Sequence, residues 1–328
     1  MNTNRTPNFF LLGAPKCGTT SLSAWLAEHP RALIPALKEA HFFNTDLANR
    51  TIRSERKYRA LFRKADARTL AVGEASTWYL YSRDAVGNIE AFCDRPSYLA
   101  LIRDPVAMAV SLYWHNRRVQ HEDAPTFECA WRLQERRARG LDLPRACPEP
   151  AFLQYRAACS TGKQLERLLA RVPSSRVLAL SLEQMKADPG SVYRRTLAFL
   201  GLPDDGRHDF PALNRARIPR SPLAQRWLLT AGRWRKRLRI PVGLGGRYLL
   251  AMNYRPPPDG ISPELRAELE ADFAEDKALA QSFLRRTQKR NTTTATTTGD
   301  DLPAALQRCR QASVTRNPSR PRSASGSP

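Results

Sequence analysis

Residues 8–13, with the sequence NFFLLG, form a short continuous apolar run that ends in glycine. A run of this length, bounded by glycine and proline, is typical of a strand buried on both faces. Residues 20–29 follow it with leucine and tryptophan at helical spacing, and Pro30 ends that pattern. A buried strand joined to a helix through a glycine-containing turn is the repeating unit of a parallel sheet. This feature therefore directs the chain toward an α/β architecture.

The alternation of buried strands and helices continues along the chain. Further strands are expected at 97–102 and 176–181, and helices are expected at 105–118, 163–171 and 188–200. A last amphipathic helix, capped by Ser262, is expected to bury Leu265, Leu269 and Phe273. We predict an α/β fold, a P-loop-like three-layer sandwich with a central parallel sheet flanked by helices. In such sheets the ligand binds beyond the carboxyl ends of the strands.

The turn after the first strand has the composition of a phosphate-binding loop. Its sequence, GAPKCGTTSL, covers residues 13–22 and leads directly into the helix, where unpaired backbone N–H groups and the helix dipole favour an anion. Glycines allow the backbone to approach a phosphate closely, and hydroxyls and an ammonium group add donors. The residues that supply these features are Gly13, Lys16, Gly18, Thr19, Thr20 and Ser21. The alternative is an ordinary strand-to-helix turn in which Lys16 is solvated.

The loop differs from the Walker A motif, in which lysine directly precedes the serine or threonine. Here Lys16 lies before Gly18, and there is no obvious Walker B aspartate at the end of a strand. Both differences argue against Mg²⁺-dependent ATP hydrolysis, although a kinase-like P-loop phosphotransferase remains an alternative function.

A second candidate anion site lies at the end of the strand 97–102. Arg103 follows that strand, and Ser111 lies two turns into the next helix, where both side chains can face one ligand. A guanidinium fork and a hydroxyl together suit a terminal phosphate. The alternative is a surface pair of Arg103 with Asp104, and a Ser111 without a ligand.

The chain is strongly basic, with 53 Lys and Arg against 31 Asp and Glu, a formal charge of +22 and a sequence pI near 10.5. Such an excess suits a polyanionic partner: a nucleic acid, an anionic membrane or a phosphate-rich small molecule. Residues 214–255 contain many arginines and no acidic residue. A nucleic-acid-binding protein is a further alternative, but no recognition motif accompanies the charge, and we expect no specific nucleic acid partner.

Cysteine usage and hydropathy bear on the compartment. The six cysteines form no CxxC pair and no cluster with His or Asp at ligand spacing, so we expect neither a disulfide framework nor a metal site. No apolar run reaches the length of a membrane-spanning helix, and the apolar run near residue 10 is too short for a secretory signal. We expect a cytoplasmic location, with peripheral contact at the inner membrane face as a further hypothesis.

Together, the two anion-site segments resemble the sulfotransferases that use 3′-phosphoadenosine 5′-phosphosulfate (PAPS). Residues 13–22 look like their 5′-phosphosulfate loop, and residues 103–115 look like their 3′-phosphate motif. The segment KEAHFF at 38–43 and the segment GEASTWYL at 73–80 resemble blocks of the heparan sulfate N- and O-sulfotransferase branch and its bacterial relatives. The resemblance covers roughly residues 8–203 well.

The resemblance implies roles for individual residues. The 5′-phosphosulfate would be held by Lys16, Gly18, Thr19, Thr20 and Ser21, the 3′-phosphate by Arg103 and Ser111, and the nucleotide additionally by Arg217 and Arg220. Lys16 would also neutralise the leaving oxygen. Glu39 would be the general base; from the residues alone, the alternative is a solvated carboxylate paired with Lys38. The spacing of two on an extended segment would let His41 orient Glu39 or act as the base itself, and the alternative is a half-buried structural histidine. Glu74 follows a strand-like run and is a third carboxylate that could reach the site.

The resemblance also implies a domain organisation and a class of acceptor. A sulfotransferase domain would occupy 1–286, with 204–260 as a basic insert on the acceptor side, and 287–328 would be a disordered basic tail. The acceptor hydroxyl or amine would belong to a carbohydrate, a lipid-linked saccharide or a small metabolite. Asn44 and Ala75 replace an Asp and a Lys of the heparan branch, which argues against a heparan-like polysaccharide.

The segment 224–250 mixes arginines with tryptophan and leucine. It suits an interfacial helix on anionic lipid, a cationic wall of the acceptor site, or a solvated helical insert that packs on the core.

Overall fold

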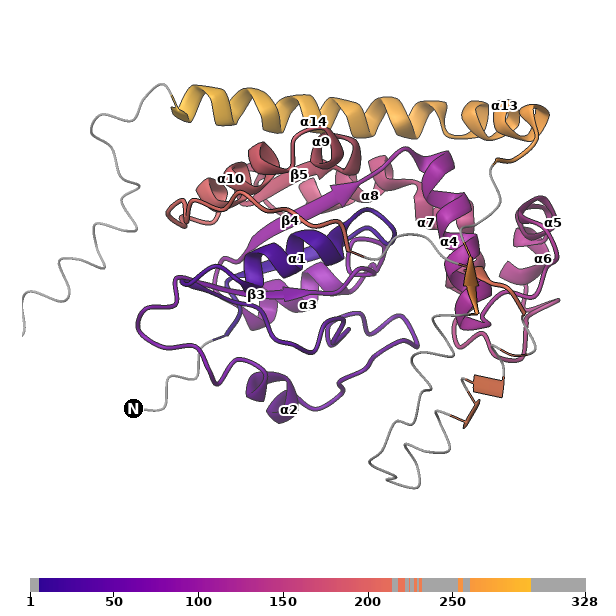
Figure 1. Cartoon of the computed structure of the whole chain (residues 1–328), viewed down its shortest axis with the longest axis horizontal. Coiled ribbons are helices and arrows are strands. Elements are labelled where there is room, and N and C mark those ends of the chain that lie inside the picture. Colours follow the sequence, from indigo (N-terminus) through magenta and orange to yellow (C-terminus); the bar gives the residue numbers. More distant parts are fainter. Residues whose placement is uncertain are drawn as a thin grey trace, which may run out of the picture. The chain divides into compact units, whose positions relative to one another are not determined.

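The computed structural model describes residues 6–213, 218–221, 224, 227–228, 230–231, 253–255 and 260–295 (Figure 1). At its centre is a five-stranded sheet in the order β2-β3-β1-β4-β5, and every pairing in it is parallel. The strands are β1 (Phe9–Gly13), β2 (Ala32–Leu33), β3 (Ala71–Ala75), β4 (Ser97–Ile102) and β5 (Val177–Ser181).

The apolar run near residue 10 forms the middle strand β1. All five of its residues are buried, since β3 and β4 flank it and helices cover both of its faces. Phe10 packs edge-on against Phe43 and stacks on Tyr98, with ring centroids 5.7 Å and 6.2 Å apart. The expected strands at 8–13, 97–102 and 176–181 are confirmed as β1, β4 and β5.

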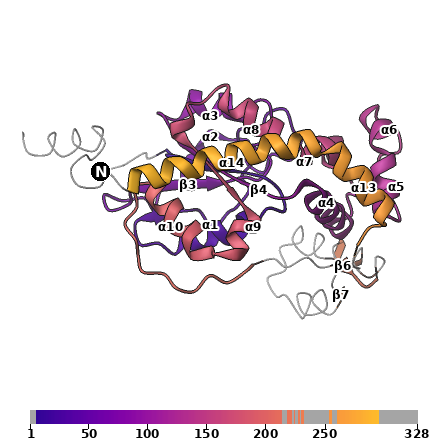
Figure 2. The ribbon, with the colours of Figure 1, turned by 90° about the horizontal axis from the view of Figure 1, so that it is seen from above.

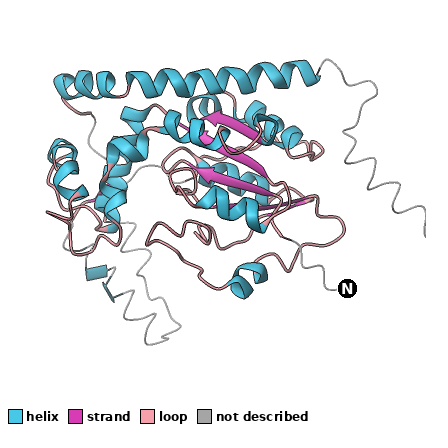
Figure 3. Cartoon of the chain, turned by 180° about the vertical axis from the view of Figure 1, so that it is seen from behind, coloured by secondary structure: helices cyan, strands magenta, loops and turns pink. Residues whose placement is uncertain are grey.

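The helices are α1 (Thr19–Ala27), α2 (Glu55–Ala60), α3 (Ala85–Phe92), α4 (Pro105–Val119), α5 (Phe127–Arg132), α6 (Gln134–Ala138), α7 (Tyr155–Cys159), α8 (Thr161–Leu169), α9 (Leu182–Ala187), α10 (Pro189–Phe199), α13 (Pro263–Asp272) and α14 (Ala274–Ala295), with the 3₁₀ turns η1 (Pro150–Leu153) and η2 (Ser174–Arg176). Figure 2 shows α1, α9 and α10 on one side of the sheet and α3 and α8 on the other. Figure 3 shows the same strands between the two helical layers from behind. The predicted three-layer α/β fold is confirmed.

Several elements were not expected from the sequence. β2 has only two residues, and α5, α6 and α7 have five or six each, too few to show a periodic apolar pattern. A separate short helix, α9, lies before α10, and a capping box formed by Ser181 and Gln184 stabilises its start. A small antiparallel pair, β6 (Ile218–Pro219) with β7 (Tyr254–Arg255), lies in the basic segment.

The C-terminal part of the domain packs on the core as the sequence indicates. Leu265, Leu269 and Phe273 are all buried, which confirms the predicted inner face of α13. The chain divides into two units, 1–285 and 286–328. α14 continues to Ala295, so a helix occupies the beginning of the stretch for which the sequence predicts disorder. The rest of that stretch lies outside the described residues, as does most of 224–250.

In the part of the chain that the structure describes, no helix combines the length and the hydropathy needed to cross a membrane.

Candidate active site

The candidate site lies where β1, β3 and β4 end. The loop between β1 and α1 requires glycine at two positions. Gly13 has φ 136°, and a Cβ there would lie 2.3 Å from the Thr77 carbonyl oxygen. Gly18 has φ 88°, and a Cβ there would lie 2.3 Å from the Met185 methyl carbon. The two glycines therefore allow the loop to turn tightly against its neighbours.

The N-terminus of α1 has no side-chain cap. Gly18 occupies the N-cap position, so the first N–H groups of the helix point into the loop without a capping oxygen. Lys38 Nζ donates to Thr20 Oγ1 at 2.7 Å and lies 3.4 Å from Thr19 Oγ1. The Ser21 hydroxyl accepts from the Leu213 N–H at 3.0 Å. The helix dipole, the hydroxyls and the Lys38 ammonium thus meet at one end of α1.

The two predicted anion sites are adjacent. The Ala14 N–H donates to the Leu101 carbonyl at 2.6 Å, which joins the β1–α1 loop to β4 just before Arg103. Burial, followed by the charges of Arg118 and Arg103, lowers the pKa of Lys16 to about 8. Among the described residues, no carboxylate lies within 4.0 Å of the Lys16 ammonium or the Arg103 guanidinium. The structure thus brings two cations without anionic partners to the same end of the sheet.

Glu39 lies beside these cations. Its N–H donates to the Ala75 carbonyl at 2.9 Å, which fixes the segment 38–41 along the end of β3. The side chain of Glu39 is 44% exposed, and one carboxylate oxygen lies 4.0 Å from Lys38 Nζ. Burial acts to raise the pKa of Glu39, but the neighbouring His41 and Lys38 outweigh burial and hold that pKa below its ordinary value. Glu39 is therefore an accessible carboxylate that is ionised at neutral pH.

His41 lies behind Glu39. Its ring is buried, with Nε2 3.6 Å from Glu39 Oε2, and its Nδ1 has no hydrogen-bond partner. The backbone N–H of His41 donates to Ser76 Oγ at 3.0 Å. Glu39 and His41 thus face each other, and Glu39 is the more exposed of the two.

Three of these residues have a left-handed backbone. Lys16, Glu39 and His41 have φ values of 65°, 61° and 48°. A positive φ is uncommon for residues other than glycine, and such conformations gather at functional sites because the surrounding structure holds them there. Their gathering at this end of the sheet supports treating the three side chains as one site.

One face of α4 completes the site. Ser111, His115 and Arg118 follow each other at spacings of four and three, so they share that face. Burial, then the charges of Lys16 and Arg118, lowers the pKa of His115 to about 3. His115 Nδ1 lies 3.1 Å from Arg118 Nη2. Sequence reasoning missed His115 and Arg118, although the helical spacing from Ser111 was a usable signal.

The sequence profile of the sulfotransferase domain matches residues 6–210. The chain belongs to the sulfotransferase domain family. The resemblance inferred from the motifs is thereby confirmed.

Individual relatives agree with the family match. The chain is 27% identical over 206 residues to human bifunctional heparan sulfate N-deacetylase/N-sulfotransferase 3, covering 61% of this chain and 23% of the relative. It is 29% identical over 199 residues to mouse heparan sulfate glucosamine 3-O-sulfotransferase 3B1, covering 60% and 46%. The chain therefore spans less than half the length of these curated relatives. A crystal structure of a sulfotransferase from Alicyclobacillus acidocaldarius superposes with a TM-score of 0.65 at 28% identity, covering 86% of this chain and 96% of that one.

Glu74 does not reach the sulfotransferase site as a free carboxylate. It is buried beneath the segment 38–43 and accepts from the hydroxyls of Tyr58 at 3.0 Å, Tyr79 at 2.9 Å and Ser76. Burial raises the pKa of Glu74 although these hydrogen bonds oppose the rise. Because Ser76 also accepts from the backbone of His41, Glu74 supports the segment that carries Glu39 and His41.

The two departures from the heparan branch are both buried. Asn44 is fully buried and donates to Asn49 Oδ1 at 2.5 Å, and Ala75 is 3% exposed. Neither side chain therefore offers a charge to an acceptor.

The remaining predicted residues fall in the basic segment. Arg217 lies outside the described residues. Arg220 is described: its N–H donates to the Asn253 carbonyl at 2.6 Å and its Nε donates to the Tyr254 carbonyl at 3.3 Å. Its guanidinium is thus bonded to β7, and its role toward a nucleotide stays a prediction. Within the described ranges, no group of three His, Cys, Asp or Glu side chains is placed to hold a metal ion.

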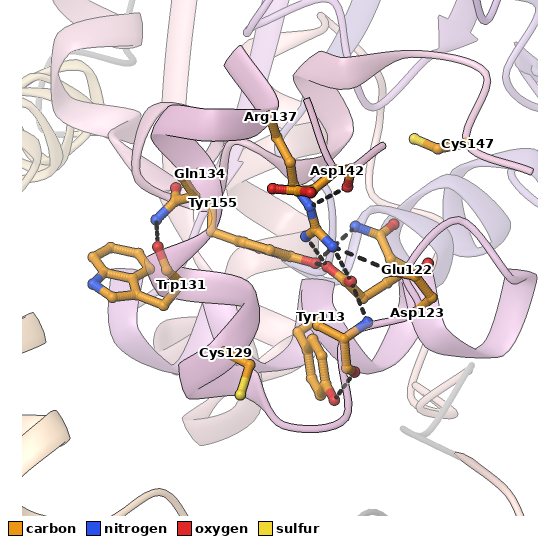
Figure 4. Close-up of polar contacts among 12 residues, drawn as sticks. Tyr113, Glu122, Asp123, Cys129, Trp131, Gln134, Arg137, Asp142, Cys147 and Tyr155 are labelled. Atoms are coloured by element: carbon orange, nitrogen blue, oxygen red, sulfur yellow. Dashed lines mark hydrogen bonds and ion pairs between the residues drawn. The ribbon is translucent and has the colours of Figure 1, made fainter. Parts of the chain in front are cut away.

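A buried polar network fixes the far end of α4 (Figure 4). Arg137 is fully buried and forms a bidentate pair with Glu122, with both distances 2.7 Å. The Tyr155 hydroxyl donates to the same carboxylate at 2.7 Å, and the Tyr113 hydroxyl of α4 donates to the Ala124 carbonyl at 3.0 Å. The network joins the C-terminal end of α4 to α6 and α7. It therefore fixes the position of the helix that carries Ser111 and His115.

Proposed function

We propose that this sulfotransferase domain transfers a sulfuryl group from PAPS to a hydroxyl or amine of an acceptor. One observation carries the proposal: two cations without carboxylate partners, Lys16 and Arg103, lie at an uncapped helix N-terminus beside the accessible Glu39. A doubly phosphorylated nucleotide ester would supply the negative charge that these groups lack. The family match favours this activity over the kinase-like alternative.

The donor would lie along the ends of β1 and β4. The 5′-phosphosulfate would be held by Lys16, Gly18, Thr19, Thr20 and Ser21, the 3′-phosphate by Arg103 and Ser111, and the nucleotide additionally by Arg217 and Arg220. The joined loops support this placement, since Ala14 is hydrogen-bonded to Leu101. No metal ion is part of the proposed site, and that absence stays a prediction.

The chain's own groups divide the work of in-line transfer. PAPS, when bound, supplies the sulfuryl group. Lys16 stabilises the negative charge that develops on the leaving oxygen, assisted by the N-terminus of α1. Glu39 accepts the proton of the acceptor hydroxyl or amine, and its lowered pKa keeps it ionised for that step. His41 and Lys38 hold the Glu39 carboxylate in place.

The acceptor class is proposed more broadly than the names of the relatives suggest. Those names specify heparan sulfate, which favours a carbohydrate acceptor. Asn44 and Ala75 add no charge on the acceptor side, so a lipid-linked saccharide or a small metabolite fits the site equally well. We propose a cytoplasmic location, with peripheral contact through 224–250 with the inner membrane face.

The test is Glu39→Gln. This change should lower the rate of sulfuryl transfer from labelled PAPS by about 10²- to 10⁴-fold, because the general base is lost while the shape of the side chain is kept. The affinity for adenosine 3′,5′-bisphosphate, measured by calorimetry, should stay unchanged, since Glu39 is not placed to bind the nucleotide.

Glu55→Gln is the matched control. Glu55 is an exposed carboxylate on α2 whose ion pair among the described residues is with Arg59, so its loss should leave both quantities at the wild-type value. An undiminished transfer rate in Glu39→Gln would assign the base to His41 instead. A wild-type protein stabilised by ATP–Mg²⁺ and not by the bisphosphate would contradict the proposed function itself.

A further inference from the structure

Two carboxylates lie near the backbone that follows the arginine proposed for the 3′-phosphate. Asp104 follows Arg103 directly and caps α4, with Oδ1 accepting from the Ala107 N–H at 3.0 Å. Glu183, at the start of α9, accepts from the Asp104 N–H at 3.2 Å. The negative charges of Asp104 and Glu183 would repel a 3′-phosphate dianion bound at Arg103. Asp104 would also compete with the phosphate for the Arg103 guanidinium.

The Asp104 carboxylate is paired with a lysine that lies far along the chain, and not with Arg103. Lys277, in the first turn of α14, donates from Nζ to Asp104 Oδ2 at 2.9 Å. This hydrogen bond raises the pKa of Lys277 above its ordinary value. Arg103, by contrast, has no carboxylate within 4.0 Å among the residues that the structure describes. The pairing therefore leaves the arginine free for a ligand.

The start of α14 is held where Lys277 can do this. Asp276 is 4% exposed and accepts from the backbone N–H groups of Gly162 at 2.9 Å and Lys163 at 2.8 Å. A Cβ at Gly162 would lie 2.3 Å from the Asp276 carbonyl oxygen, so the helices α8 and α14 approach closely at this point. Asp276 and Lys277 lie beyond residues 6–210, the part that matches the family profile, whereas Gly162 and Lys163 lie within it.

We propose that Lys277 is a positioning residue for the 3′-phosphate site: it neutralises Asp104, so that Arg103 stays available and the site selects a 3′-phosphorylated nucleotide. This inference rests on the proposed function. Lys277 would act through Asp104, whose carboxylate it contacts, and not as a ligand of the donor.

The test compares two nucleotides by calorimetry, adenosine 3′,5′-bisphosphate and adenosine 5′-monophosphate, which differ at the 3′-phosphate. Lys277→Met should weaken the bisphosphate by about three- to tenfold and change the monophosphate by less than about twofold. Adding Asp104→Asn to Lys277→Met should restore the bisphosphate affinity, because asparagine caps a helix as well as aspartate but carries no charge.

Lys163→Met is the matched control. Lys163 pairs with Glu275 across the same two helices at 3.8 Å, but at an exposed position away from Arg103. Its loss should leave both affinities unchanged. The proposal is overturned if Lys277→Met keeps the wild-type ratio of the two affinities, or if Asp104→Asn fails to restore it. A wild-type protein that binds both nucleotides equally would instead contradict the proposed function.

Discussion

At the scale of single residues, the candidate site places the Lys16 ammonium near two other positive charges, those of Arg118 and Arg103. Lys16 is half-buried among other cations, and the lowered pKa of Lys16 shows that its protonated form is destabilised while no anion is present. A bound phosphosulfate or bisphosphate would reverse that balance. Binding and protonation of this lysine must therefore be linked.

This linkage predicts a pH dependence. The Lys16 pKa in the free protein is about 8, so the protonated fraction falls above that pH. Affinity for adenosine 3′,5′-bisphosphate should fall by about twofold between pH 7 and pH 8, and above pH 8 the fall should approach about tenfold for each further unit. Calorimetry in buffers of different ionisation heats measures both the affinity and the proton uptake.

Lys16→Met supplies the comparison for that titration. Methionine keeps the length of the side chain without its charge, so binding should be weak and its pH dependence above pH 7.5 should disappear. The melting temperature near neutral pH should not fall, because a lysine with a lowered pKa destabilises the fold below that pKa. An identical pH profile in Lys16→Met would attribute the titration to another group.

At the residue scale, the sequence indicates chemistry where the residues that share it are neighbours in the chain. Lys16 lies in a short motif whose residue types indicate an anion site, whereas the role of Glu39 as a base came from the family resemblance, and both roles stay predictions. The hydrogen bond of Tyr58 with Glu74 and the pairing of Lys277 with Asp104 join residues that are 16 and 173 positions apart in the sequence. No local pattern encodes such contacts, so these roles could be read only from the folded chain.

At the scale of elements, α4 is the part that organises the site. Its N-terminus is capped by Asp104, its middle carries Ser111 and His115, and its far end is held by the Arg137–Glu122 network. The position of Ser111 and His115 therefore depends on the contacts at both ends of α4. The long strands and helices were predictable because they repeat a period, whereas β2 and the short helices that build this network were not.

The buried pair at the far end predicts a large effect on stability. Arg137→Met should lower the free energy of unfolding by about 3–5 kcal/mol, because it leaves the Glu122 carboxylate buried without its partner. Urea unfolding measures the loss. Arg137→Met combined with Glu122→Leu should recover a large part of it, since no buried charge then remains unpaired.

An exposed pair gives the contrast for this experiment. Arg59 and Glu55 lie one turn apart on α2, and Arg59→Met should cost at most about 1 kcal/mol. Equal losses for Arg59→Met and Arg137→Met would show that the network contributes no more than a surface ion pair.

At the scale of the whole molecule, the order of the elements indicates the fold class, whereas the net charge indicates only that the partner is anionic. The order and type of the long elements fixed the α/β class, but the charge of +22 left the partner open among nucleotide, nucleic acid and membrane. Lys16 and Arg103 both lie within residues 6–210, the part that matches the sulfotransferase family. The acid-free segment 214–255 lies beyond that match. Apart from Arg217 and Arg220, which are proposed for the nucleotide, its arginines have no role in the proposed site.

That segment gives the last prediction, which is binding to anionic membranes. Trp227 is 76% exposed, and a tryptophan among arginines is suited to the interface of a bilayer. The full chain should co-sediment with vesicles containing phosphatidylglycerol and not with neutral phosphatidylcholine vesicles. Each arginine near the surface contributes about 1 kcal/mol at low salt, so binding should be lost as ionic strength rises.

Trp227→Ala separates lipid insertion from simple charge attraction. It should weaken binding to the anionic vesicles by about five- to twentyfold without changing the affinity for adenosine 3′,5′-bisphosphate, because the tryptophan lies outside the proposed nucleotide site. Trp114→Phe, on α4, is the control for loss of a tryptophan within the domain and should leave vesicle binding unchanged. Equal binding to anionic and neutral vesicles, or none to either, would remove the membrane hypothesis and leave the acceptor wall or a solvated insert as the role of 224–250.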